Sequence, residues 1–576
     1  MTRRLSALRV GNFKAFADTQ RIPLKPITLI FGPNSAGKSS FIHSLALAHE
    51  AQFGREKRSL ARLDVHHTDI GGSSIDLGGF RQFIHRGQAN KRMEWGAELN
   101  VSALTSIKDQ RLAQLLAPVK TVMLSIALGI ELDDQDRPKL GAEPRVESIE
   151  ISGDGVELVR MSRRSADSQG STLRLDRLAS DHPVFRQVLK AIVESATTSE
   201  EMRPEDFDGA NEAIANLLPE LLVRVEQFFP TAVELPKREG VELSPMSMLF
   251  PVSKGNRKED IAQAVSFYLP RTLADLVKGL SDTLADELRQ LQYLGPLRSF
   301  PPRHLAFAEH EDANWYAGGG YAWDKVRREE SVREVVNRWL GSSKLKTPYK
   351  LVVRSMVALD QLQTPLEQGL EDVQSEGGIN MEPDYDGKDP DPVSAYPVIK
   401  DIEAEALRLV TGIDSSGVDR ILELVLIDLR TNTVVTHRDV GIGISQVLPV
   451  LVLAYGSQGK LLAMEQPEIH LHPALQAELG DVFIEAALGD RQNTFILETH
   501  SEHLILRLMR RMRESHQNKE TGLPKLTPSD VSVLYVEPDG TRSIVREMPL
   551  NELGELVKSW PGGFFEEGLR EQFGDA

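Results

Sequence analysis

A run of nine residues near the N-terminus has the composition of a phosphate-binding loop. Gly32-Pro33-Asn34-Ser35-Ala36-Gly37-Lys38-Ser39-Ser40 matches the pattern G-x-x-x-x-G-K-[ST] in full. Glycine lets the backbone approach phosphate oxygens closely, and the start of a helix offers free N–H donors and a favourable dipole. We predict that Lys38 binds the β- and γ-phosphates of ATP and that the Ser39 hydroxyl is a ligand of Mg²⁺. A chance glycine turn before a helix is the alternative interpretation.

A second group of polar side chains follows two apolar segments in the C-terminal half. Leu461 to Met464 is followed by Glu465-Gln466-Pro467-Glu468, and Thr494 to Leu497 is followed by Glu498-Thr499-His500-Ser501. If both segments are parallel strands, they end at the edge of the sheet where ligands bind. We then expect Glu465 to hold Mg²⁺ directly or through water, and His500 to reach the γ-phosphate. A purely structural role is the alternative for His500.

The phosphate loop needs a strand before it and a helix after it, and the sequence supplies both. Ile27 to Phe31 is an apolar run, and a helix is expected to begin near Lys38. Further strands are expected to alternate with helices, as in a parallel sheet, at residues 421–429, 460–464, 494–497 and 531–536. The nucleotide-binding fold is therefore predicted to be split between the two ends of the chain.

The middle of the chain has two different patterns. Alternating apolar and polar residues from Trp95 to about Leu175 predict an antiparallel β-layer. Helical spacing follows from Asp181 to Gln292, and it includes an expected buried stripe of Leu217, Leu218, Leu221, Leu222 and Val225. The predicted class is α/β, with a mixed β-layer, a parallel sheet with flanking helices, and a large, mainly helical insertion.

These patterns predict four regions. They are residues 1–90 with the phosphate loop, 91–180 with the β-layer, 181–400 with the helical insertion and an acidic loop at about 360–400, and 401–576 with the C-terminal part of the nucleotide-binding fold.

The composition limits the classes of protein that remain. The chain has 576 residues, a net charge of −17 and no cysteine. Its length predicts more than one lobe, and the lack of cysteine excludes disulfides and favours a cytoplasmic location. The acidic balance argues against broad, non-specific binding to nucleic acid, because that affinity comes from Lys and Arg. The longest apolar run, Val447 to Tyr455, is too short for a membrane helix, so no membrane association is expected.

Five motifs together resemble the SMC- and RecF-related branch of the ABC ATPases. They are Asn12-Phe13-Lys14, the phosphate loop, Val440 to Pro449, Glu465 to Pro473 and Thr499 to His503. More narrowly, they resemble bacterial AAA-labelled ATPases found with Septu-, Gabija- and OLD-type systems that defend against phage. Tyr293 to Arg298 and Trp560 to Phe565 resemble a subgroup with an uncharacterised C-terminal domain. The resemblance covers both ends of the chain and little of the middle.

This resemblance implies an ABC-type ATPase head that binds ATP and Mg²⁺ and forms a homodimer or a higher even oligomer. In that family, a glycine-serine segment of one protomer caps the γ-phosphate held by the other. Gly443, Ser445 and Gln446 are therefore expected to bind nucleotide in trans, and an ordinary helix cap at Ser445 is the alternative. The family's Q-loop glutamine, which belongs to the metal site, is assigned to Gln82, for which a plain surface position is the alternative.

At one catalytic position the sequence departs from this family. The residue after the metal-binding acid is usually a glutamate that polarises the attacking water, and here it is Gln466. An amide takes no proton at neutral pH, and general-base assistance is worth about 10² to 10⁴ in rate. Gln466 can still orient water, so we expect an ATPase with slow turnover. Glu468 is an alternative base.

The resemblance also implies a biological role, which is an ATP-gated sensor or switch in an anti-phage defence module. The resemblance implies that such a protein acts with a separately encoded effector, here expected to be a nuclease. A TOPRIM nuclease within this chain is not expected, because no Asp-x-Asp pair follows Glu537 to complete its metal site. A DNA-repair or chromosome-maintenance ATPase of the RecF/SMC type is one alternative, and a transporter-coupled ATPase is another. Arg507, Arg510 and Arg511 share one predicted helix face, which is either solvated or a contact for nucleic acid or an acidic partner.

Overall fold

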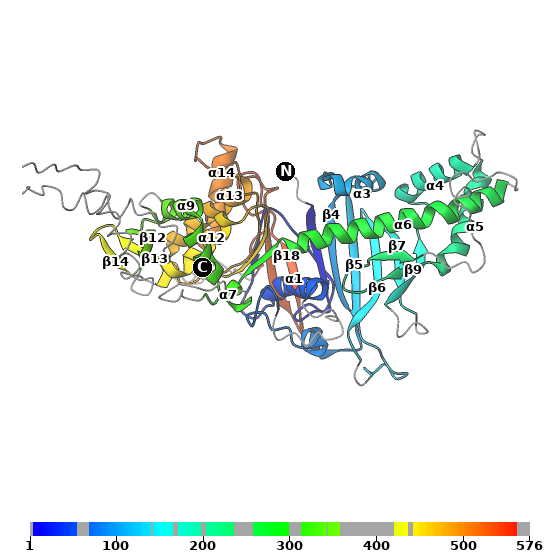
Figure 1. The fold of residues 1–576 in the computed structure, drawn as a ribbon, viewed down its shortest axis with the longest axis horizontal. Helices are drawn as coiled ribbons and strands as arrows, with labels where there is room; N and C mark the ends of the chain where they lie inside the picture. The colour runs from blue at the N-terminus through cyan, green and yellow to red at the C-terminus, as the bar shows by residue number, and fades with distance from the viewer. Residues whose placement is uncertain are drawn as a thin grey trace, which may run out of the picture.

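The computed structural model describes residues 4–54, 68–139, 142–164, 171–196, 203–234, 257–298, 313–341, 344–357, 420–435 and 442–561. The predicted acidic loop at about 360–400 lies outside these ranges. The described chain is elongated, with one large sheet toward one end and a second sheet near the middle (Figure 1).

The large sheet has nine strands, and every neighbouring pair is antiparallel. Its order is β10-β9-β8-β7-β6-β5-β4-β1-β2. The strands are β1 (Leu5–Gly11), β2 (Gln20–Pro23), β4 (Met93–Asn100), β5 (Thr121–Gly129), β6 (Arg145–Gly153), β7 (Val156–Ser162), β8 (Thr172–Leu178), β9 (Leu222–Arg224) and β10 (Ala232–Glu234). The sheet contains the predicted antiparallel layer and extends it at both edges.

The second sheet has six strands and joins the two ends of the chain. Its order is β11 (Leu291–Leu294), β15 (Leu461–Glu465), β16 (Thr494–Glu498), β3 (Ile27–Phe31), β17 (Val531–Asp539) and β18 (Arg542–Glu547). The first five strands are parallel, and β18 pairs antiparallel with β17. The N-terminal strand β3 therefore lies between two strands from the C-terminal part, so the α/β class and the split are confirmed.

One predicted strand belongs elsewhere. The segment expected at 421–429 forms β13 (Arg420–Asp428), which pairs antiparallel with β12 (Tyr349–Val357) and β14 (Thr433–Val435) in a separate three-stranded sheet. Its placement in the parallel sheet was wrong, because apolar alternation predicts a strand but does not choose its partner.

The parallel sheet separates two hydrophobic cores. In β3, Ile30 faces the core shared with the nine-stranded sheet, whereas Ile27, Leu29 and Phe31 face the other core. The same alternation holds along β15, β16 and β17. A parallel sheet that is buried on both faces needs continuous apolar strands, and these four strands have them.

Helices cover both sheets. They are α1 (Lys38–Phe53), α2 (Phe80–Phe83), α3 (Gln110–Leu115), α4 (Pro183–Ala196), α5 (Pro204–Leu217), α6 (Arg257–Arg289), α7 (Ala313–Ala317), α8 (Gly320–Arg328), α9 (Glu330–Leu340), α12 (Ile442–Gly456), α13 (Pro473–Leu488) and α14 (Glu502–His516). The long helix α6 runs along the nine-stranded sheet to α4 and α5, whereas α9, α12, α13 and α14 lie by the parallel sheet (Figure 1). No helix in the described ranges is both long and apolar enough to cross a membrane.

The region predicted as a helical insertion also contains strands. The expected stripe from Leu217 to Val225 is not one helix, because α5 ends at Leu217 and a short 3-10 turn containing Pro219 leads into β9. A proline in the interior of a helix breaks or kinks it, because proline lacks the N–H and its ring crowds the preceding turn. Residues 181–400 thus supply β9 to β12 as well as helices.

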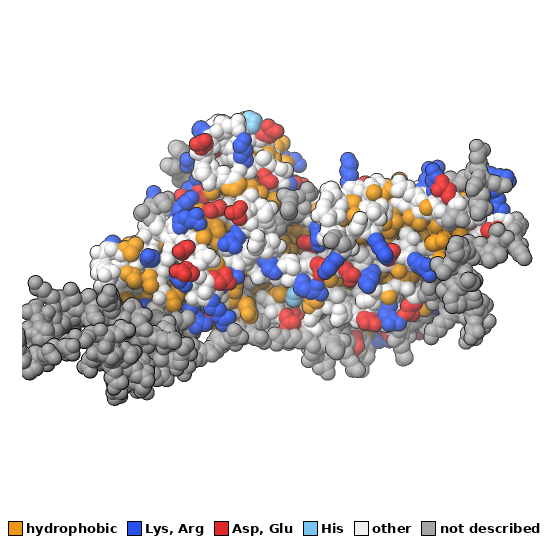
Figure 2. Space-filling model, turned by 45° about the horizontal axis from the view of Figure 1, so that its top comes forward, with side chains coloured by type: hydrophobic (Ala, Val, Ile, Leu, Met, Phe, Trp, Pro, Cys, Tyr) orange, Lys and Arg blue, Asp and Glu red, His pale blue; other side chains and the backbone are white. Residues whose placement is uncertain are grey.

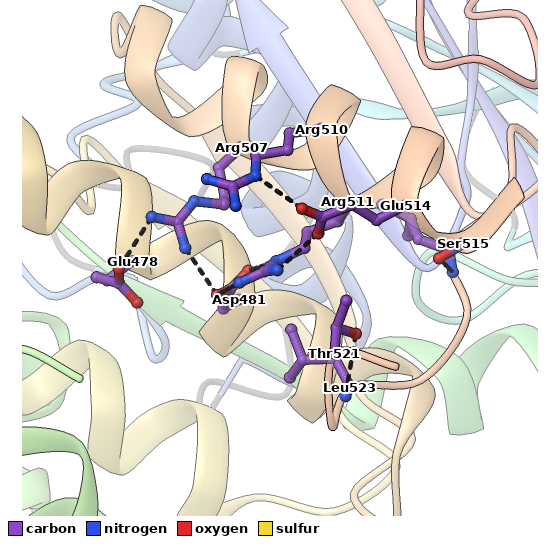
Figure 3. Close-up of polar contacts among 10 residues, drawn as sticks. Glu478, Asp481, Arg507, Arg510, Arg511, Glu514, Ser515, Thr521 and Leu523 are labelled. Carbon is purple, nitrogen blue, oxygen red and sulfur yellow. Dashed lines mark hydrogen bonds and ion pairs between the residues drawn. The ribbon is translucent and has the colours of Figure 1, made fainter. Parts of the chain in front are cut away.

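The arginines of α14 are held by carboxylates of the same protein. Arg507 donates to Asp481 at 2.8 Å and to Glu478 at 2.9 Å, and Arg511 donates to Asp481 at 2.7 Å (Figure 3). Asp481, on α13, is 1% exposed. These ion pairs fasten α14 to α13, so most of the predicted basic face is not available to an external ligand.

We predict that Asp481→Ala lowers the free energy of unfolding by about 3 kcal/mol, because it leaves two guanidinium groups without their shared buried partner. Chemical denaturation followed by circular dichroism measures the change. Asp286→Ala is the matched control, since Asp286 pairs with Arg289 on the surface, and this change should stay within about 0.5 kcal/mol. Equal effects of the two substitutions would contradict the buried role.

Candidate functional site

The phosphate loop connects β3 to α1 in a conformation that its glycines allow. Gly32 has φ 147° and Gly37 has φ 92°. A Cβ on Gly32 would lie 2.2 Å from the Val536 carbonyl oxygen of β17, and a Cβ on Gly37 would lie 2.3 Å from the Ala15 Cβ. The loop is therefore fixed between β17 and the turn after β1. Lys38 is buried and donates its Nζ to the Pro33 carbonyl at 2.9 Å.

Two carboxylates lie opposite each other at the ends of β15 and β16. The register pairs Glu465 with Glu498, and both side chains are buried. The Lys38 Nζ lies 4.0 Å from Glu498 Oε1. Burial raises the pKa of the Glu498 carboxyl to about 7 and Glu465 adds to the shift, whereas a hydrogen bond with Ser39 and the charge of Lys38 oppose it. The predicted residues Lys38, Ser39 and Glu465 thus meet around Glu498.

Three further side chains position Glu465 and its surroundings. The Tyr293 hydroxyl of β11 donates to Glu465 Oε1 at 3.0 Å, and His43 Nε2 of α1 lies 3.4 Å from the same oxygen. Lys14 Nζ lies 2.6 Å from His43 Nδ1. Burial lowers the pKa of Lys14, while the Glu465 charge opposes this change. None of the three was assigned to the site from sequence, although Lys14 and Tyr293 occur in motifs that carried the family resemblance.

His500 is held at the turn between β16 and α14. The main-chain N–H of His500 donates to Glu468 Oε1 at 2.7 Å. Burial lowers the pKa of His500, and the charge of Lys38 lowers it further, so the imidazole is neutral. Its buried Nε2 has no hydrogen-bond partner within the described residues. A phosphate oxygen would satisfy this atom, which fits the predicted contact with nucleotide. Glu468 holds the turn in place, because its Oε1 accepts this hydrogen bond from His500.

The oxygen ligands fit Mg²⁺. Ser39 offers a hydroxyl, and Glu465 and Glu498 offer carboxylates, of which the buried Glu498 Oε2 has no hydrogen-bond partner in the described ranges. No group of three or more His, Cys, Asp or Glu side chains in those ranges is arranged to hold a metal ion alone. This fits Mg²⁺, which usually binds one or two carboxylates together with water and substrate phosphates. Sequence reasoning missed Glu498, whose signal was a carboxylate at the end of an apolar strand.

Gln82, the predicted Q-loop residue, is on the surface in this structure. It is exposed on α2, and its side chain folds back over Gly78, where a Cβ would lie 2.8 Å from the Gln82 Cβ. No contact of Gln82 with Ser39 or Glu465 occurs in the part of the chain that the structure describes.

The predicted trans-acting segment begins α12. Gly443 is partly exposed, whereas Ser445 and Gln446 are only 2% and 5% exposed. In the single chain, the side chains of Ser445 and Gln446 therefore face the protein interior. Gln466 is half-buried at the edge of the carboxylate cluster and has φ 46°, a left-handed conformation that is costly for a residue other than glycine.

A phosphate loop on a central parallel strand, with acidic residues at the ends of the next two strands, defines a P-loop ATPase domain. Family models support this class. Residues 7–118 match a model described as "AAA domain", and residues 278–507 match "AAA domain, putative AbiEii toxin, Type IV TA system". The chain therefore carries an AAA-type P-loop ATPase domain in two parts. Each match covers less than half of the chain, and no curated protein matches the sequence.

A third model, "Protein of unknown function (DUF3696)", matches residues 526–572. In the structure, this segment supplies β17 and β18 to the ATPase sheet. Its Trp560 packs against Phe31 and Tyr535, with ring centroids 5.4 Å and 5.9 Å away. Phe31 directly precedes the phosphate loop, so residues 526–561, the described part of this segment, belong to the ATPase domain.

Solved structures of SMC heads also align with the chain. The head domain from Thermotoga maritima is 9% identical and has a TM-score of 0.33, covering 95% of this chain and 100% of the head. The Pyrococcus yayanosii head is 10% identical with a TM-score of 0.33, covering 96% and 98% of the two chains. A head bound to the C-winged helix domain of ScpA is 10% identical with a TM-score of 0.31, covering 95% and 98%. Scores at this level are too low to carry an argument.

We predict that Glu498→Gln stabilises the nucleotide-free protein at high pH. The pKa of Glu498 is about 7 in the folded protein and ordinarily 4.5, so between these values the folded state keeps a proton that the unfolded chain releases. The free energy of unfolding therefore falls as pH rises through this window, by up to about 3 kcal/mol. The substitution should recover this loss at pH 8 and have little effect at pH 4.5.

Denaturant unfolding at a series of pH values, with EDTA present, measures this prediction. Glu212→Gln is the control, because Glu212 is an exposed partner of Lys258 and should change the free energy of unfolding by at most about 0.5 kcal/mol. Parallel pH profiles for the wild type and Glu498→Gln would rule out the raised pKa.

Proposed function

We propose that this protein is an ATP-binding, slowly hydrolysing ATPase that works as a nucleotide-gated dimeric switch. The observation that carries the proposal is the convergence of Lys38, Ser39, Glu465, Glu498 and His500, from both ends of the chain, around one buried point. The Lys38 ammonium and the helix start favour a polyphosphate, and the oxygen ligands favour its Mg²⁺. At the end of β15, Gln466 occupies the position where the family has its general base.

Each group has a distinct part in this mechanism. Lys38 and the N–H groups of the loop bind the β- and γ-phosphates, and His500 contributes Nε2 to the γ-phosphate. Ser39, Glu465 and Glu498 would hold Mg²⁺, which neutralises charge on the phosphates. Gln466 orients the attacking water without accepting its proton, so the chemical step is slow. Bound ATP, rather than its turnover, then determines the state of the dimer.

The family resemblance implies a dimer, and this dimer requires a conformational change in α12. Gly443, Ser445 and Gln446 are proposed to cap the nucleotide of the partner protomer. Since Ser445 and Gln446 are buried in the single chain, the first turn of α12 has to shift before they reach that nucleotide.

The proposed setting is a bacterial anti-phage module with a separately encoded nuclease as effector. The family resemblance supports it, as does the matched family whose description names a putative toxin of a type IV TA system. Co-purification with the products of neighbouring genes, with and without a non-hydrolysable ATP analogue, tests this role. Recovery of a nuclease only with the analogue supports the module, and recovery of no partner under either condition opposes it.

The DNA-clamping alternative makes a different prediction, namely salt-sensitive binding of duplex DNA by the isolated protein. Basic and acidic side chains are interspersed on the face shown in Figure 2, and Arg507 and Arg511 are engaged in ion pairs. Neither feature favours a continuous basic surface for DNA.

We predict that Lys38→Ala weakens binding of Mg²⁺-ATP by on the order of 10²-fold, because it removes a charged hydrogen-bond donor to the phosphates. Titration with a fluorescent ATP analogue measures the affinity, and light scattering with a non-hydrolysable analogue measures the dimer. Lys91→Ala is the control, since Lys91 is exposed and outside the site. If Lys38→Ala binds ATP like the wild type, the assignment of the loop is wrong.

We predict that Gln466→Glu increases steady-state ATP turnover by on the order of 10²-fold, because a carboxylate restores the missing base. Gln466→Ala should be slower than the wild type, because it also loses the orientation of water. A wild-type protein that already turns over ATP as fast as Gln466→Glu would refute the slow-hydrolysis mechanism.

A further inference from the structure

Arg298 extends from the end of β11 into the interior between α12 and the end of β15. Its Nη1 donates to the Gln446 carbonyl at 2.8 Å, and its Nη2 donates to the Gln466 carbonyl at 2.8 Å. Longer contacts reach the Pro467 carbonyl at 3.5 Å and the Glu465 carbonyl at 3.4 Å. One guanidinium therefore joins the first turns of α12 to the backbone that carries the metal-binding acid.

Because the Arg298 guanidinium is charged and buried, its stability depends on the positions of the carbonyls that accept its hydrogen bonds. The residue is 6% exposed, and its hydrogen bonds are to main-chain carbonyls. Burial lowers the pKa of Arg298 to about 10, and the Glu468 charge opposes this change, so the guanidinium stays charged at neutral pH. A buried charge is tolerated only while its hydrogen-bond acceptors remain in place. When one of the two segments shifts, the other is drawn with it.

The sequence explains why this turn of α12 accepts an outside donor. Pro449 lies inside the helix, three residues after Gln446. Proline has no N–H, so the helix lacks the hydrogen bond that residue 449 would make to the Ser445 carbonyl, and the proline ring crowds that same turn. Arg298 reaches this turn one residue later, at the Gln446 carbonyl. The planar fork of arginine suits two carbonyls from different segments, which a lysine ammonium cannot span in the same way.

The other end of the junction reaches the carboxylate cluster. Gln466 donates its N–H to the Glu498 carbonyl at 2.8 Å and offers its own carbonyl to Arg298. Its left-handed conformation is held by these two contacts. A change at Glu465 or Glu498 on nucleotide binding therefore passes through the Gln466 peptide to Arg298.

We propose that Arg298 is a positioning residue that transmits occupancy of the nucleotide site to the first turns of α12. The inference rests on the proposed function, because it assumes that ATP binds at Lys38 and that Gly443 and Ser445 meet a partner. Arg298 has no contact with nucleotide in this account. It acts through the backbone of Gln446 and Gln466.

Hydrogen exchange measured by mass spectrometry on the full chain tests the inference, with and without Mg²⁺ and a non-hydrolysable ATP analogue. In the wild type, the analogue should slow exchange in peptides covering the phosphate loop and alter exchange in peptides covering 442–450. Arg298→Lys should keep the first response and lose the second. Its kcat should fall by on the order of 10²-fold, while its KM for ATP stays within about 3-fold.

Two further variants make the result specific. Arg333→Lys is the matched control, because Arg333 on α9 also donates to main-chain carbonyls, those of Val326 and Arg327, away from the site. It should keep both exchange responses. Arg298→Gln removes the buried charge together with the fork, so it avoids an unpaired charge and serves if Arg298→Lys does not fold.

The outcomes distinguish a failure of the proposed function from a failure of the role of Arg298. If the wild-type phosphate loop shows no response to the analogue, the proposed function fails. If that loop responds but 442–450 does not, or if both Arg298 variants keep the 442–450 response, the proposed function stands and the role of Arg298 is overturned. Loss of the 442–450 response in the folded Arg298 variants alone supports the role.

Discussion

The burial of two carboxylates next to each other is the constraint on which this site depends. Glu465 and Glu498 share one register position on adjacent strands, with Lys38 beside them. Two negative charges this close in a poorly solvated position cannot both be stable without compensation, and burial together with the Glu465 charge raises the pKa of Glu498, which favours a proton on its carboxyl. A divalent cation bound by Glu465 and Glu498 would supply the same compensation. Tyr293 and His43 fix the position of Glu465, and Lys14 lies against His43.

The C-terminal segment that matches a family of unknown function is bound into this arrangement. β17 lies beside β3, its Val536 carbonyl limits the space around Gly32, and Trp560 packs on Phe31. The phosphate loop is therefore shaped by residues about 500 positions away in the chain. A structural role in the ATPase domain is sufficient to explain why this segment accompanies a P-loop.

The sequence predicted the local elements well because their signals are local. The apolar run before Gly32, the helix from Lys38 and the strands ending at Glu465 and Glu498 each follow from periodicity and flanking residues. Which strands pair with each other could not be predicted from these signals. The strand at 421–429 has the same apolar pattern as the strands of the parallel sheet, yet it pairs in a different sheet. The same limit explains the site residues that were missed. Nothing near Arg298, His43 or Tyr293 in the sequence shows which carbonyl or carboxylate each will meet.

The position of β3 between β16 and β17 has a consequence for how the protein is made. The ribosome releases β3 before both of its neighbours, which emerge more than 460 residues later. At typical rates of elongation, this delay is about 20 to 90 s. For that time an apolar strand is exposed, with its backbone hydrogen-bonding groups unpaired on both sides. Prematurely terminated chains that lack β15 and β16 also lack Glu465, Glu498 and His500, so they cannot assemble this site.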